Sequence, residues 1–139
     1  MNWKLIFSLT LFGVAMGIAP ILGFVPPAFE WLFWLVIALF CAWWIAKKAA
    51  AKLFLHGFMV GLIDGLVAPI ITAIFFSPYM ANNPSYAEQA KQIPGGLDPR
   101  TFSLILAPVI GVVYGMVLGF FAWLAGKIFK KPVASSPTN

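Results

Sequence analysis

The sequence predicts an all-α integral membrane protein, a four-helix bundle with glycine-rich packing faces. Its residues are 62% hydrophobic and 9% charged, with a mean hydropathy of +0.95, which is far from the composition of soluble domains. Four apolar runs are each long enough to cross a hydrocarbon core of about 30 Å. In three of them glycines recur at every fourth residue, a spacing typical of helices in close contact.

The 139 residues suffice for a single domain, which we place at 1–131. Its first predicted span is 4–24, anchored by Trp3 at its start and ended by the prolines at 26 and 27. Gly13 and Gly17 form a packing pair on this helix, and Pro20 is expected to kink its outer end.

The second predicted span, 29–46, follows a turn so short that the two helices must be antiparallel neighbours. It contains no glycine and is rich in aromatic residues, namely Trp31, Phe33, Trp34, Phe40, Trp43 and Trp44. Tryptophans at both ends are typical of residues at the headgroup level. The pattern predicts a helix that faces lipid or docks another protein.

The third predicted span, 53–77, carries one carboxylate, Asp64. On a helix, Asp64 shares about a third of the circumference with Gly57, Gly61 and Gly65. Small residues in this arrangement mark the close approach of another helix. An ionisable group on such a face is a candidate intramembrane polar site.

A polar outer loop is predicted at 78–100, where Asn83 and Pro84 have the pattern of a helix N-cap followed by N1. We expect a short helix there, ending near Gln92. Asp98 and Pro99 repeat the pattern before the fourth span. The loop either caps a pore, recognises a partner or is a spacer.

The fourth predicted span, 101–126, places Gly111, Gly115 and Gly119 on one face, so it is expected to pack against the third. In an antiparallel pair Tyr114 lies level with Asp64, and its hydroxyl is a candidate donor to that carboxyl group. Residues 132–139 have no apolar cluster to bury and are predicted to be a disordered cytoplasmic tail.

Seven of the nine cationic residues fall on one side of a four-span topology, which predicts that both termini are cytoplasmic. These are Lys4, Lys47, Lys48, Lys52, Lys127, Lys130 and Lys131. The positive charge therefore sets orientation, and no basic groove accompanies it that would indicate nucleic-acid binding. His56 lacks further ligands at useful spacing, and Cys41 is a single cysteine, so no metal site, cofactor or internal disulfide is predicted.

The layout also carries a family resemblance. Two spans, a lysine-rich return, the stretch GFMVGLIDGLVAPIITAIFF, the segment NPSYAEQA and a glycine-rich fourth span ending in KIFKK resemble small four-helix bacterial inner-membrane proteins of unknown function. The resemblance implies a multi-pass location in the bacterial inner membrane. It implies no activity.

Two functions agree with this sequence. The first is a non-catalytic accessory, assembly or scaffold subunit that associates with a membrane-protein partner or with itself in the lipid bilayer. The alternative is a small oligomeric transporter or channel that uses Asp64 as an intramembrane proton or cation site. An enzyme is not expected, because catalysis usually needs several convergent polar groups and the spans offer few.

Overall fold

A computed structural model of the chain describes residues 1–129, and within this range it is helical and contains no β-strand. Lys130, Lys131 and the tail predicted at 132–139 lie outside the described residues. The α-helices are α1 (Trp3–Leu9), α2 (Leu11–Ile18), α3 (Glu30–Lys48), α4 (Leu53–Ile74), α5 (Phe76–Asn82), α6 (Pro84–Ala90) and α7 (Pro99–Phe129). Two short 3-10 helices, η1 (Pro27–Phe29) and η2 (Pro94–Gly96), precede α3 and α7.

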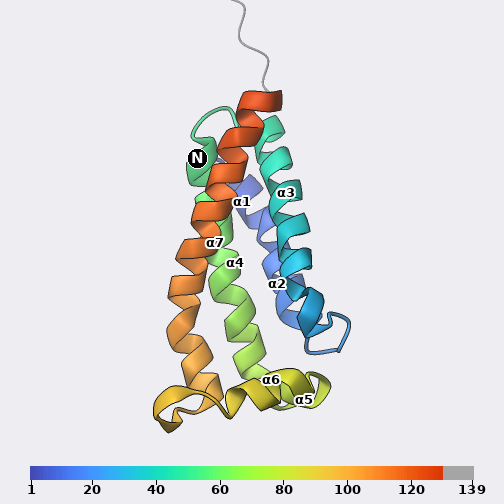
Figure 1. The fold of residues 1–139 in the computed structure, drawn as a ribbon. Helices are drawn as coiled ribbons and strands as arrows, with labels where there is room; N and C mark the ends of the chain where they lie inside the picture. Colours follow the sequence, from blue (N-terminus) through green and yellow to red (C-terminus); the bar gives the residue numbers. More distant parts are fainter. Residues whose placement is uncertain (130–139) are drawn as a thin grey trace, which may run out of the picture.

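The helices form an elongated bundle with two distinct ends (Figure 1). At the basic end, the C-terminus of α3 and the start of α4 meet around Lys47, Lys48 and Lys52. At the loop end, α5 and α6, which connect α4 to α7 in the chain, lie across the end of the bundle. Three helical segments are long and apolar enough to cross a membrane, namely Pro27–Lys48, Leu53–Ile74 and Pro99–Phe129.

The first apolar helix is shorter than the sequence predicts. It ends at Ile18 rather than at 24 and is interrupted at Thr10, whose hydroxyl donates to the Phe7 carbonyl at 2.9 Å. Pro20 lies in the turns after the helix and therefore does not kink it, and Gly23 has a φ of +77° that suits glycine. At about 1.5 Å per residue, Trp3–Ile18 reaches about 24 Å.

The central helices are α4 and α7, which lie side by side along the bundle with their glycines facing one another (Figure 1). A methyl group placed on Gly61 would lie 2.7 Å from the Cα of Gly115, closer than real side chains come. Gly57 stands in the same way against Gly119, and Gly65 against Gly111. The two backbones therefore touch along three turns, an approach that only glycine permits.

The other inner face of the bundle comes from α3, which the sequence analysis expected to face lipid or a partner. Its C-terminal half instead contributes to the core the small residues at 38, 41, 42 and 46 together with Ile45, and Ala49 at the end of the helix continues the same spacing. With them pack Ile6 of α1, Val60 of α4 and Leu118 of α7, each with no exposed surface. The closely packed core thus lies toward the basic end.

The segment at the loop end contains one more helix than the sequence predicts. Besides α6, which begins at Pro84 as expected, α5 continues the chain directly after α4. The side chain of Asn83 does not cap α6. It is buried and donates to the carbonyl oxygens of Pro20 and Tyr79, both at 2.8 Å. Asn83 therefore fastens α5 and α6 to the turn that follows α2.

Candidate functional site

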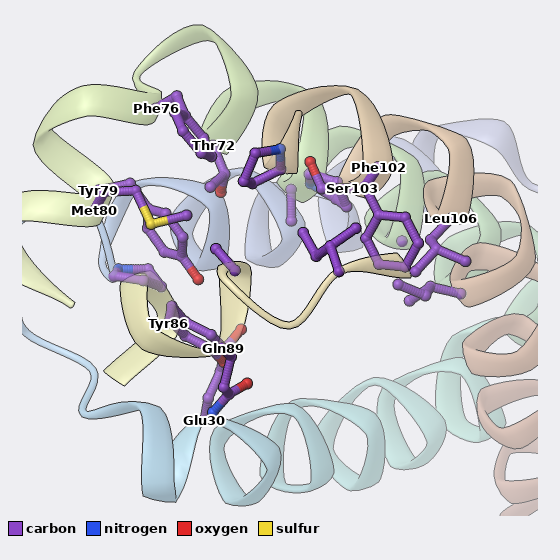
Figure 2. A pocket seen from close by; sticks show the side chains of 18 of the residues that line it. Glu30, Thr72, Phe76, Tyr79, Met80, Tyr86, Gln89, Phe102, Ser103 and Leu106 are labelled. Carbon is purple, nitrogen blue, oxygen red and sulfur yellow. The ribbon is translucent and has the colours of Figure 1, made fainter. Parts of the chain in front are cut away.

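The loop half of the bundle contains a cavity of about 540 Å³ that is open to the surface, a size typical of small-molecule sites. It lies between the ends of α2 and α4, the starts of α3 and α7, and the cap formed by α5 and α6 (Figures 1 and 2). Its polar lining residues are Glu30, Thr72, Tyr79, Tyr86, Gln89, Gln92 and Ser103. The rest of the lining is apolar or aromatic, including Trp34, Phe76, Phe102 and Leu106.

Three of the polar side chains, Glu30, Tyr79 and Tyr86, lie together on one side of this cavity, whereas Ser103 lies beside Phe102 (Figure 2). Tyr86 of α6 donates its hydroxyl hydrogen to Glu30 Oε2 at 2.5 Å, and its ring stacks on that of Tyr79, with centroids 5.5 Å apart. Figure 2 shows Glu30, Tyr79 and Tyr86 across the cavity from Phe102 and Leu106. Burial, followed by the nearby Glu30 carboxylate, raises the pKa of Tyr86 above its usual value, so its hydroxyl keeps its proton and remains a donor at neutral pH.

A second cavity of about 410 Å³ adjoins the first between α3 and α7. The two cavities share Trp34, Gly65 and Ile110 as lining residues. Apart from the Tyr114 hydroxyl and the Trp31 and Trp34 indoles, the side chains that line it carry no polar group, and it continues along Leu35, Ala38 and Val117. The site is therefore an amphipathic space, polar toward the loop end and apolar along the bundle.

Asp64 lies outside both cavities. Its side chain is fully buried at the contact between α2 and α4, one residue before Gly65, and therefore faces α2 rather than α7. A methyl group on Gly13 would stand 2.5 Å from Asp64 Oδ1, so the glycine backbone packs directly on the carboxyl group. Within residues 1–129, neither carboxyl oxygen has a hydrogen-bond donor at normal geometry, and the backbone N–H of Gly13 makes only a weaker contact with the carboxyl group.

Tyr114 does not donate to Asp64. Its hydroxyl instead points to the backbone carbonyl of Trp34 at 3.3 Å, and the two rings meet edge to face with centroids 5.0 Å apart. The physical reason is the rotation of α4: its glycines face α7, which turns Asp64 by one residue toward α2. Asp64 and Tyr114 therefore do not form the hydrogen-bonded pair that the sequence suggested.

His56 serves as a structural anchor near the basic end. It is buried, its Nε2 accepts a hydrogen bond from the backbone N–H of Asn2 at 2.9 Å, and its Nδ1 donates to the Lys52 carbonyl at 2.9 Å. Both ring nitrogens are thus engaged with backbone groups. In the part of the chain that the structure describes, no three His, Cys, Asp or Glu side chains gather as metal ligands.

No motif in the sequence singles out Glu30, Tyr79 or Tyr86. One signal was present, because Glu30 directly precedes an apolar run, and a carboxylate at such a boundary needs a polar partner. The partner could not be identified from the sequence, since Tyr86 lies 56 residues further along the chain.

Comparison of the chain with protein-family models, curated proteins and solved structures found no match.

Proposed function

We propose that this chain is a non-catalytic integral membrane protein that serves as an accessory, assembly or scaffold subunit of a membrane complex or homo-oligomer. Its location is the bacterial inner membrane, with both termini cytoplasmic, as the lysine distribution and the layout of the chain indicate. A face of the bundle that already packs against another helix of the chain is not available to a partner, so partner contact is expected at the outward faces.

The supporting observation concerns α3. The glycine faces of α2, α4 and α7 are already occupied inside the chain, so association through them would require the bundle to open. The N-terminal half of α3 remains outward, with Trp31 65%, Phe33 43% and Val36 58% exposed. Aromatic side chains are enriched in the cores of protein interfaces. We therefore assign partner contact to this face of α3.

Photo-crosslinking in native membranes tests this assignment. A photoreactive residue at Val36, on the outward face of α3, should yield one discrete adduct with a membrane protein or with a second copy. The matched control is Val109 on α7, which is equally exposed at 59% and should react only with lipid. Lipid adducts alone at both positions would contradict the proposal.

A second candidate function is a small oligomeric transporter or channel in which Asp64 binds a proton or a cation. It is favoured by one observation, the complete burial of two carboxyl oxygens that have no hydrogen-bond donor at normal geometry within the described residues. One observation disfavours this transporter or channel function. Asp64 lines neither cavity, so an ion would reach it only after α2 moved away from α4.

Asp64→Asn separates the two functions, because the amide preserves size but cannot release a proton or carry charge. For a scaffold we expect normal assembly and an unchanged phenotype when the variant replaces the wild-type chain in a deletion strain. A variant that folds and assembles yet leaves the deletion phenotype uncorrected would favour the transporter and would contradict a packing role for Asp64.

A further inference from the structure

The cavity capped by α5 and α6 contains a carboxylate without a cationic partner. Within residues 1–129, Glu30 forms no ion pair, and only its Oε2 accepts a hydrogen bond, from Tyr86. Among the described residues, no Lys or Arg lines the cavity. Of the two cations near the loop end, Lys91 pairs with Glu88 at 2.7 Å and Arg100 lies over the Phe76 ring. Glu30 therefore gives the cavity a negative character.

Aromatic rings surround the same space. Trp34, Phe76, Tyr79, Tyr86 and Phe102 all contribute to the lining, and they come from four different helices. Aromatic faces beside a carboxylate attract organic cations, and ammonium groups are the typical ligands of such arrangements. The polar part of the cavity thus matches an ammonium head.

The adjoining cavity has the properties required by an alkyl chain. It leaves the first cavity at Trp34 and Ile110 and follows Leu35 and Val117 along α3 and α7. Several of its lining side chains reach the bundle surface, since Trp31 is 65% exposed and Ile110 48%. A ligand could therefore enter sideways between α3 and α7, with its head toward the loop end.

We propose that the two cavities form one binding site for an amphiphile with an ammonium head and an alkyl chain. The head lies beside Glu30 among the rings of Tyr79 and Tyr86, and the chain lies in the groove between α3 and α7. The ligand is either a membrane lipid with an ammonium head, such as a phosphatidylethanolamine, or a free lipophilic amine. This site goes beyond the accessory role and does not depend on it.

The full-length protein in nanodiscs of an uncharged glycolipid provides the test, with empty nanodiscs as the reference. Binding of dodecyltrimethylammonium and of dodecyl sulfate is measured by calorimetry. We expect saturable binding of the cation and none of the anion with the same chain. This comparison needs no variant, and equal binding of the two probes would overturn the proposal.

Variants then assign the two parts of the site. Glu30→Gln removes the charge while its amide oxygen still accepts from Tyr86, and it should weaken cation binding about tenfold or more. Val117→Trp should obstruct the chain groove, whereas Val113→Trp, which is on the same helix, exposed and outside both cavities, should not. Wild-type affinity in folded Glu30→Gln or in Val117→Trp would also overturn the proposal.

A competition experiment distinguishes a membrane lipid from a free amine as the ligand. If the site holds an ammonium-headed lipid, doping the nanodiscs with phosphatidylethanolamine should lower the apparent affinity for dodecyltrimethylammonium, and Glu30→Gln should abolish that effect. An unchanged affinity would assign the site to free amines. Photolabelling with a diazirine on the alkyl chain should mark peptides containing Leu35 or Val117, and labels confined to other helices would contradict the proposed position.

Discussion

Gly13 of α2 packs directly on the carboxyl group of Asp64 in the interior of the bundle. Because Gly13 has no side chain, α2 can approach α4 until its backbone rests on the carboxyl group. Any side chain at position 13 would occupy the volume of Asp64 Oδ1 and Cγ. The pair therefore leaves no space beside Asp64 on the side of α2.

Gly13→Ala should lower stability by about 1–3 kcal/mol, because overpacking a buried contact forces both helices to shift. Thermal unfolding in detergent measures the effect. Ala15→Leu, which adds more volume on the exposed side of the same helix, is the control and should change the melting temperature little. Equal tolerance of the two changes would show that α2 does not press on Asp64.

At the level of the helices, the α4–α7 pair is the rigid unit to which the others attach. Its closeness depends on glycine at both sides of each contact, since a methyl group on Gly115 would also meet the Phe58 carbonyl at 2.7 Å. The contacts are between backbones, which cannot yield as a flexible side chain would. Neither α3 nor α2 has a comparable series of glycine-to-glycine contacts.

Gly61→Leu should separate α4 from α7 and strongly reduce the yield of folded protein, because the new side chain meets the backbone of Gly115. Size-exclusion chromatography and thermal unfolding report the loss. Ile74→Leu, at a position 66% exposed on the same helix, serves as the control. Wild-type behaviour of Gly61→Leu would place the glycines away from the interface.

Asn83 connects the cap to the bundle through two hydrogen bonds, and it is 1% exposed. Asn83→Ala should cost about 1–3 kcal/mol, because the carbonyl groups of Pro20 and Tyr79 lose their donor. Hydrogen exchange should then become faster in α6, with Ser85→Ala as the exposed control. Unchanged protection in Asn83→Ala would mean that other contacts hold the cap.

The molecule as a whole is asymmetric along its long axis. Toward the basic end, small residues of α3 allow the helices to converge on a closely packed core. Toward the loop end, Trp31 and Trp34 replace them, α3 and α7 are separated by the two cavities, and the cap closes the end. The proposed binding site and the closely packed core thus lie in opposite halves of one bundle.

The topology of the whole chain can be tested with reporter fusions. Fusions before Met1 and after Asn139 should both report the cytoplasm, and one inserted after Gly96, in the turn before α7, should report the opposite side. The result depends on the short helix Trp3–Ile18, which must cross the membrane for the two termini to agree. Termini on opposite sides would show that only the three long helices cross.

The sequence alone predicted the helical class, the spacing of small residues on helix faces and four apolar spans, of which three are long apolar helices in the structure and the first is the shorter segment Trp3–Ile18. These properties follow from local periodicity and from the length of apolar runs, which neighbouring residues reveal. Small residues recur with the same period in α3, but its many aromatic residues led to the prediction that this helix faces lipid or docks another protein. The position of α6 was predicted too, since proline at N1 is a local signal.

Tertiary structure decided which side chains meet. Asp64 and Gly65 differ by one position, and only the rotation of α4 against its neighbours turned the glycine to α7 and the carboxyl group to α2. Glu30 and Tyr86 lie far apart in the sequence and join only because α5 and α6 fold back across the bundle. Such pairings depend on helix rotation and chain reversal, which no local pattern specifies.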